Sequence, residues 1–154
     1  MIELAAHPKL DPEISGRELR EDIEIATAMM IYAIRKNLGG FHFAGLRVPW
    51  IIQIWEPGRK LPEVESFATE VATFQEQMHE RIVSLAHNQA MVRKMWSLNE
   101  KTRHFRECEL HRPEAARDVL DKTSALLNAL FSRDPELCST ILLQCAERRY
   151  SLLV

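Results

Sequence analysis

Four residues in the second half of the chain combine side chains that bind metal ions with a spacing that places them on one helical face. They follow one another at offsets of four, four and three positions: Glu100, His104, Cys108 and His111. Imidazole nitrogens and thiolates are typical zinc ligands, and these offsets align on one side of an α-helix. Three cationic neighbours oppose a bound dication: Arg103, Arg106 and Arg112. We therefore expect surface histidines with a buried cysteine and no cofactor, and keep metal binding as an alternative.

Arg106 and His111 also form an Arg-x4-His pair. This spacing is similar to that of the helical HEPN-type ribonucleases, and the resemblance implies a pair acting on an RNA phosphate. The pattern is unspecific, because a chain with this many arginines and histidines contains about one or two such matches by chance. Glu76-x-x-His79 is half of a di-iron motif, and the chain has no second Glu-x-x-His. Motifs for nucleophilic catalysis or phosphate loops are absent, so we expect a protein that is not an enzyme.

Basic residues gather in the segment 93–117 and could form part of a face that binds nucleic acid. They are Arg93, Lys94, Lys101, Arg103, Arg106, Arg112 and Arg117. The net charge of the chain is −2, so its overall field does not attract a polyanion. No helix-turn-helix spacing with a turn glycine is evident. Nucleic-acid binding through this segment is therefore a second alternative.

Length and composition predict one ordinary globular domain over residues 1–154, with 46% hydrophobic and 27% charged residues. The three cysteines are an odd number without a Cys-x-x-Cys pair, which favours a reducing compartment. The N-terminus lacks the pattern of a signal peptide. The most apolar run, residues 25–34, is too short to span a bilayer. We expect a cytoplasmic protein that does not enter a membrane.

The elements that must position these residues are helices. The segment 63–112 contains no glycine and no proline, and its apolar residues recur at steps of three and four. As one straight helix it would be about 75 Å long, far more than a domain of this size accommodates. Its weakest apolar patch lies at His87, Asn88 and Gln89. We therefore predict one long helical stretch that breaks or bends between Ala86 and Asn99.

Further helix starts are marked by proline followed by glutamate, at Pro12, Pro62, Pro113 and Pro135. The first helix is predicted from about Pro12, or from Ser15 if Ser15 and Glu18 form a capping box, to Leu38, before Gly39-Gly40. Two more follow, from Pro113 to about Ser132 and from Pro135 to the C-terminal end. The predicted fold is an all-α, single bundle of about five helices.

The connection 39–62 is irregular and rich in aromatic residues: Phe41, Phe43, Trp50 and Trp55. Pro49 precedes the run 50–55 and favours a short helix there, whereas the β-branched and aromatic content favours a strand. The aromatic residues could line a pocket, form an exposed patch for a partner, or lie across the bundle as part of its core.

Charge along 63–112 is divided into an acidic half up to Glu80 and a basic half from Arg81. Two such helices packed antiparallel would be complementary in a two-fold dimer. We therefore predict a protein-protein interaction module with a regulatory, adaptor or assembly role, which forms a homodimer. The predicted interaction residues are Phe41, Phe43, Trp50, Trp55, Arg93, Arg103 and Arg106.

Overall fold

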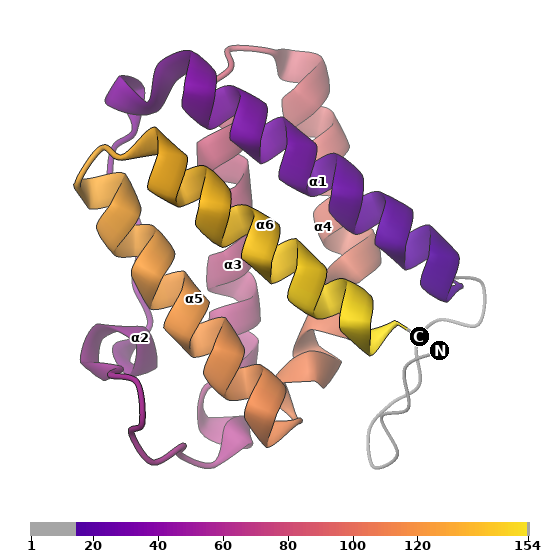
Figure 1. Ribbon diagram of the computed structural model, residues 1–154, viewed down its shortest axis with the longest axis vertical. Coiled ribbons are helices and arrows are strands. Elements are labelled where there is room, and N and C mark those ends of the chain that lie inside the picture. Colours follow the sequence, from indigo (N-terminus) through magenta and orange to yellow (C-terminus); the bar gives the residue numbers. More distant parts are fainter. Residues whose placement is uncertain (1–14, 154) are drawn as a thin grey trace.

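The computed structural model describes residues 15–153, and within them the chain forms six α-helices and no strand (Figure 1). The prediction of an all-α bundle is confirmed. Helices α3 and α4 lie behind α1, α5 and α6 in the view of Figure 1. α1 packs against α6, α3 and α4, and α5 packs against α6 and α4. No helix in this part of the chain is long and apolar enough to cross a membrane.

Helix α1 spans Gly16–Asn37 and begins at the second of the two predicted starts. The Ser15 hydroxyl oxygen accepts a hydrogen bond from the Glu18 backbone N–H at 3.1 Å, which satisfies one of the free donors of the first turn. A 3-10 turn, η1 (Leu38–Gly40), follows the helix. The alternative start at Pro12 and the N-terminal segment considered for a signal peptide lie outside the described residues.

The aromatic connection contains a short helix, α2 (Trp50–Ile54), which is one of the two alternatives that the sequence left open for the run 50–55. Trp55 follows it and donates its indole N–H to Asp121 Oδ1 at 2.7 Å, which fastens the connection to α5. Phe41 and Ile51 are completely buried. This segment therefore lies across the bundle as part of its core, which was the simplest of its interpretations.

The long stretch 63–112 is divided into two antiparallel helices, α3 (Ala68–Ser84) and α4 (Gln89–Leu110). The break at residues 85–88 lies at the beginning of the predicted interval. Asn88 caps α4 because its side-chain oxygen accepts from the Met91 N–H at 3.1 Å. The predicted helix start at Pro62 is wrong, since only a 3-10 turn, η2 (Val64–Ser66), precedes α3.

The last two helices are α5 (Pro113–Phe131) and α6 (Pro135–Leu152), and both begin at the predicted prolines. Asp134 caps α6 by accepting from the Leu137 N–H at 3.0 Å. Most of the buried apolar residues form one large cluster, and a second, small cluster contains Leu19, Ile23, Phe105 and Ala146.

The acidic and basic halves of 63–112 are joined within the chain at one glutamate. Glu76 of α3 accepts from Arg106 Nη2 at 2.5 Å and lies 3.5 Å from Arg103 Nη1, and both arginines are in α4. One glutamate and two arginines of the pattern that suggested an antiparallel dimer are therefore used inside the bundle.

Candidate functional site

Two small cavities adjoin one another in the middle of the bundle. The smaller, of about 30 Å³, lies mainly between α1 and α4, and the larger, of about 60 Å³, extends between α3, α5 and α6. Both are lined by Ile23, Thr27, Met30, His79 and Arg149. The larger cavity has room for roughly four waters or a few non-hydrogen atoms of a ligand.

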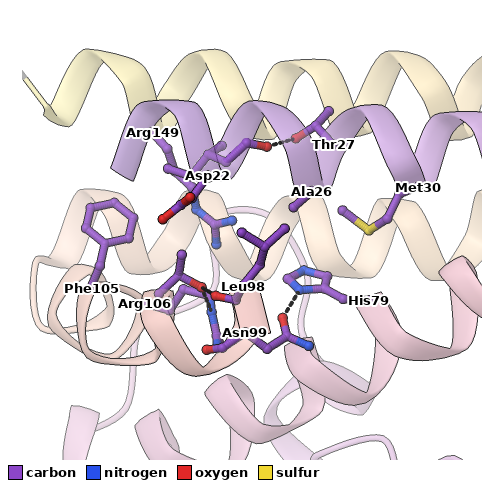
Figure 2. Close-up of a pocket in the computed structure, with 12 residues that line it drawn as sticks. Asp22, Ala26, Thr27, Met30, His79, Leu98, Asn99, Phe105, Arg106 and Arg149 are labelled. Carbon is purple, nitrogen blue, oxygen red and sulfur yellow. Dashed lines mark hydrogen bonds between the residues drawn. The ribbon is translucent and has the colours of Figure 1, made fainter. Parts of the chain in front are cut away.

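His79 projects from α3 toward the space between the helices (Figure 2). Its Nδ1 lies 2.9 Å from Asn99 Oδ1, and the Asn99 amide group donates to the Glu76 carbonyl oxygen at 3.4 Å. This arrangement of Asn99 makes Nδ1 the protonated nitrogen of the neutral ring, so Nε2 carries a lone pair. Burial, together with the positive charge of Arg106, lowers the pKa of His79 from 6.5 to about 3. His79 is therefore a neutral hydrogen-bond acceptor at the cavities.

Gln75 lies one helical turn before His79 and lines the larger cavity. The residue is 7% exposed, and its Oε1 is buried without a hydrogen-bond partner among the described residues. A buried amide oxygen without a partner costs about 1–3 kcal/mol. A molecule that donates a hydrogen bond in this cavity would remove that cost.

Arg149 of α6 is held by Glu109 of α4. Its Nε and Nη2 both donate to the Glu109 carboxylate, with the shortest contact at 2.7 Å. Burial alone lowers the pKa of Arg149, but the charge and hydrogen bonds of Glu109 outweigh this and raise it. Since Glu109 takes only one edge of the guanidinium, Nη1 remains for a group in the cavities that Arg149 lines.

Arg106 also lines the smaller cavity, but its donors are used by the protein. They reach Ala72 O at 2.9 Å, Asn99 O at 2.9 Å, Thr102 Oγ1 at 3.3 Å and the Glu76 carboxylate. Burial lowers the pKa of Arg106, while Glu76 opposes that shift. Arg106 connects α3 and α4, and its charge adds to the effect of burial in keeping His79 neutral.

Lys122 of α5 and Cys145 of α6 lie on the wall of the larger cavity. The Lys122 ammonium group is 3.6 Å from Asp118, a loose contact that leaves it able to turn toward a ligand. Burial raises the pKa of the Cys145 thiol to about 11. Among the residues that the structure describes, the larger cavity is lined by two cations and by no carboxylate, a composition that favours an anionic group over a metal ion.

The predicted metal set does not come together. Within residues 15–153 no group of three or more His, Cys, Asp or Glu side chains is arranged to hold a metal ion. Glu100 and His111 lie eleven positions apart on α4 and its C-cap, so the stripe extends over about 16 Å along the helix axis. The four residues therefore lie on one face of the helix, but they are too far apart to coordinate a single metal ion.

The predicted interaction residues differ in how far they are exposed to solvent. Phe41, Trp55 and Arg106 are buried, which corrects their assignment to an exposed surface. Phe43 is partly buried and contacts the Phe41 ring edge-on at a centroid distance of 5.0 Å. Trp50 and Arg93 are exposed, while Arg103 bonds to Thr73, Glu76 and Glu107.

The Arg106–His111 pair of the ribonuclease-like pattern is not available to an RNA phosphate. The Arg106 guanidinium is buried, with 1% of its side chain exposed, and His111 Nδ1 lies 3.0 Å from the Glu107 carbonyl oxygen. Because Arg106 is buried, it does not contribute to the basic face considered for the segment 93–117.

The cavity residues were largely missed at the level of sequence. His79 was considered only as part of a di-iron motif, whereas Asp22, Gln75 and Arg149 were not considered. One signal was present: Asp22 and Gln75 each occupy a position in phase with the apolar, inward-facing residues of a helix. A polar residue at such a position needs a buried partner or a ligand.

Residues 59–148, more than half of the chain, match the model of the FCD domain family. FCD domains are helical regulatory domains found as the C-terminal domain of GntR-type regulators, and they often bind ligands. α1 lies outside the matched residues but packs against α3, α4 and α6 inside them. No curated protein and no solved structure matches the chain.

Proposed function

Because the chain belongs to the FCD domain family, we propose that it is a regulatory domain that responds to a small polar ligand bound in the central cavities. One observation carries this proposal: within residues 15–153, Gln75 Oε1 is a buried acceptor without a partner, on the wall of the larger cavity and one turn from the lone pair of His79. Two adjacent acceptors require a donor from the ligand. Arg149 and Lys122 supply donors for an acceptor on the same molecule.

The ligand that fits this wall is small, carries a negative charge, and has a hydroxyl group. The hydroxyl donates to Gln75 or His79, and the carboxylate accepts from Arg149 and Lys122. The volume of the larger cavity, about 60 Å³, limits the ligand to a few non-hydrogen atoms. Hydroxycarboxylates of two or three carbons carry these groups on about five or six non-hydrogen atoms and come nearest to this size.

Ligand binding is tested by thermal unfolding of the ligand-free protein with and without such compounds. We expect two- and three-carbon hydroxycarboxylates at millimolar concentration to raise Tm, and unsubstituted carboxylates of the same length to raise it less. If no hydroxycarboxylate of this size shifts Tm or gives heat on titration, the ligand-binding proposal is wrong.

A substitution of Gln75 tests the site itself. Gln75→Leu removes the unpaired acceptor, so the ligand-free protein should become more stable by about 1 kcal/mol while ligand affinity falls at least tenfold. Gln77→Leu is the matched control because Gln77 is an exposed residue of the same helix. Unchanged affinity in Gln75→Leu would place the ligand elsewhere.

The proposal includes action through protein association, with a second copy of the chain as the first partner, and a cytoplasmic location. Membership of a family whose regulators often oligomerise supports this, as do several large apolar side chains exposed on the bundle. Nucleic-acid contact is not favoured for this chain, since Arg106 is buried and Arg103 is engaged by α3.

A further inference from the structure

The outward face of α1 carries an ordered stripe of exposed residues. At steps of four, three, four and three, the stripe contains Glu21, Ile25, Ala28, Tyr32 and Arg35, and all five are exposed. Ile25 is 39% and Tyr32 is 53% exposed. These steps repeat every seven residues, which is the spacing of a helix that packs along its length against another helix. Inside the chain, α1 already uses the opposite face for the core.

α6 extends this apolar surface. Arg35 lies 3.5 Å from Glu136, near the start of α6, and Arg20 lies over the Tyr150 ring, near its end. α1 and α6 therefore run antiparallel, side by side (Figure 1). Leu143 is midway between Glu136 and Tyr150 in the sequence, which places it at the level of the middle of α1. It is 50% exposed.

The stripe has opposite charges at its two ends. Glu21 and Glu24 are exposed in the first half of α1, and Arg35 and Lys36 are exposed in the last turn. The ion pairs of Glu21 and Arg35 within the chain are loose: Arg35 and Glu136 are both more than half exposed, as are Glu21 and its neighbour Arg17 at 3.6 Å. Ion pairs of this kind rearrange at little cost when a better partner arrives. Lys36 is held more firmly, because its Nζ donates to Ala86 O at 2.7 Å.

We propose that this face binds a second copy of the chain, with the two α1 helices antiparallel about a two-fold axis near Ala28. In this register Glu21 lies opposite Arg35 of the second copy, and Ile25 packs beside Tyr32 of the second copy. The small side chain of Ala28 lets the helices approach closely at the axis. Leu143 of each copy covers the flank. A parallel arrangement would instead bring like charges together.

This inference rests on the self-association included in the proposed function and names its surface. It is independent of the cavities, because every measurement below uses ligand-free protein. Failure of the dimer would therefore leave the ligand-binding test untouched.

Cross-linking tests the register. In Ala28→Cys the new thiol faces its own copy across the two-fold axis, so mild oxidation should give a disulfide-linked dimer at least tenfold faster than in Arg93→Cys, which places an exposed cysteine on α4. The unsubstituted protein gives the background of its own three cysteines. Equal rates for the two cysteine variants would overturn the proposed register.

Charge exchange tests the specificity of the pairing. Analytical ultracentrifugation at about 10–100 µM should show a dimer for the unsubstituted chain. Glu21→Arg and Arg35→Glu should each weaken the dimer at least tenfold, and the double variant should recover most of the loss, since the pair is restored in reverse. A monomeric unsubstituted chain over this range, or a double variant as weak as the singles, overturns the proposal.

Discussion

Arg106 Nη2 of α4 lies 2.5 Å from Glu76 Oε2 of α3, and this ion pair connects the two helices of residues 63–112. Only 1% of the Arg106 side chain is exposed, against 21% of the Glu76 side chain. The remaining donors of Arg106 satisfy carbonyl oxygens at Ala72 and Asn99. A residue chosen from the sequence as a surface contact is thus one of the main internal connections of the fold.

Arg106→Ala should destabilise the protein by about 3 kcal/mol, because it leaves a carboxylate and two carbonyl oxygens without their partner. Urea unfolding followed by circular dichroism measures this loss. Arg103→Ala is the control on the same helix: Arg103 contacts the same glutamate but its side chain is 41% exposed, so the loss should stay below about 1 kcal/mol. Equal losses in the two variants would contradict the structural role given to Arg106.

Helix type and most helix ends could be predicted because their causes are local. Ser15, Asn88 and Asp134 each accept a backbone N–H at the start of a helix, and proline in the first turn marks α5 and α6. Pro62 carries the same local signal as Pro113, yet no α-helix starts there. The reason is tertiary: Phe67, with φ of −140°, turns into the core before α3 begins.

The cavities could not be predicted in the same way. Periodicity says that Asp22, Gln75 and Arg149 face inward, but not that they meet around an unfilled space between five helices. That space depends on how far each side chain reaches after the helices have packed. The charge pattern of 63–112 is used in part within the chain, where Glu76 pairs with Arg103 and Arg106, and its use between two chains stays a prediction.

The turn between α3 and α4 holds a second prediction. His87 has φ of +52°, in the left-handed region that favours glycine. His87→Gly should relieve this strain, which stabilises the protein by about 1 kcal/mol. Loss of the contact between the His87 ring and Asn37 Nδ2, at 3.2 Å, reduces this gain. Arg133, with φ of +57°, is the comparison, because Arg133→Gly also loses the hydrogen bond from its Nη1 to Leu38 O at 3.2 Å. That variant should show little net change. A Tm for His87→Gly well below that of the unsubstituted chain would contradict this reasoning.

The thiols of α6 should be unreactive in the folded protein. Burial raises the pKa of Cys138 and of Cys145 to about 11, so only about one thiol in a thousand is ionised at pH 8. Alkylation followed by mass spectrometry should therefore modify both at least tenfold more slowly in the native protein than in urea. Rapid labelling of Cys145 in the native state would mean that the cavity wall opens easily to solvent.

His79 should make the stability depend on pH. Its pKa is lowered from 6.5 to about 3 in the folded protein, so below pH 6.5 the unfolded chain binds a proton that the folded chain does not. The stabilisation is fully present above pH 6.5 and is lost as pH falls, by up to about 1.4 kcal/mol per pH unit. Urea unfolding at pH 7.0, 6.0 and 5.5 measures this slope, in a range where most carboxylates stay ionised.

His79→Gln is the matched variant for that experiment, since its amide can still donate to Asn99 Oδ1 but does not titrate. Between pH 7.0 and 5.5, the free energy of unfolding should fall in both proteins. The fall should be smaller by about 1 kcal/mol in His79→Gln than in the unsubstituted protein. The remaining slope in the variant reports the other titrating groups. Parallel slopes in the two proteins would mean that His79 titrates normally, and that its Nε2 is not the neutral acceptor on which the ligand site depends.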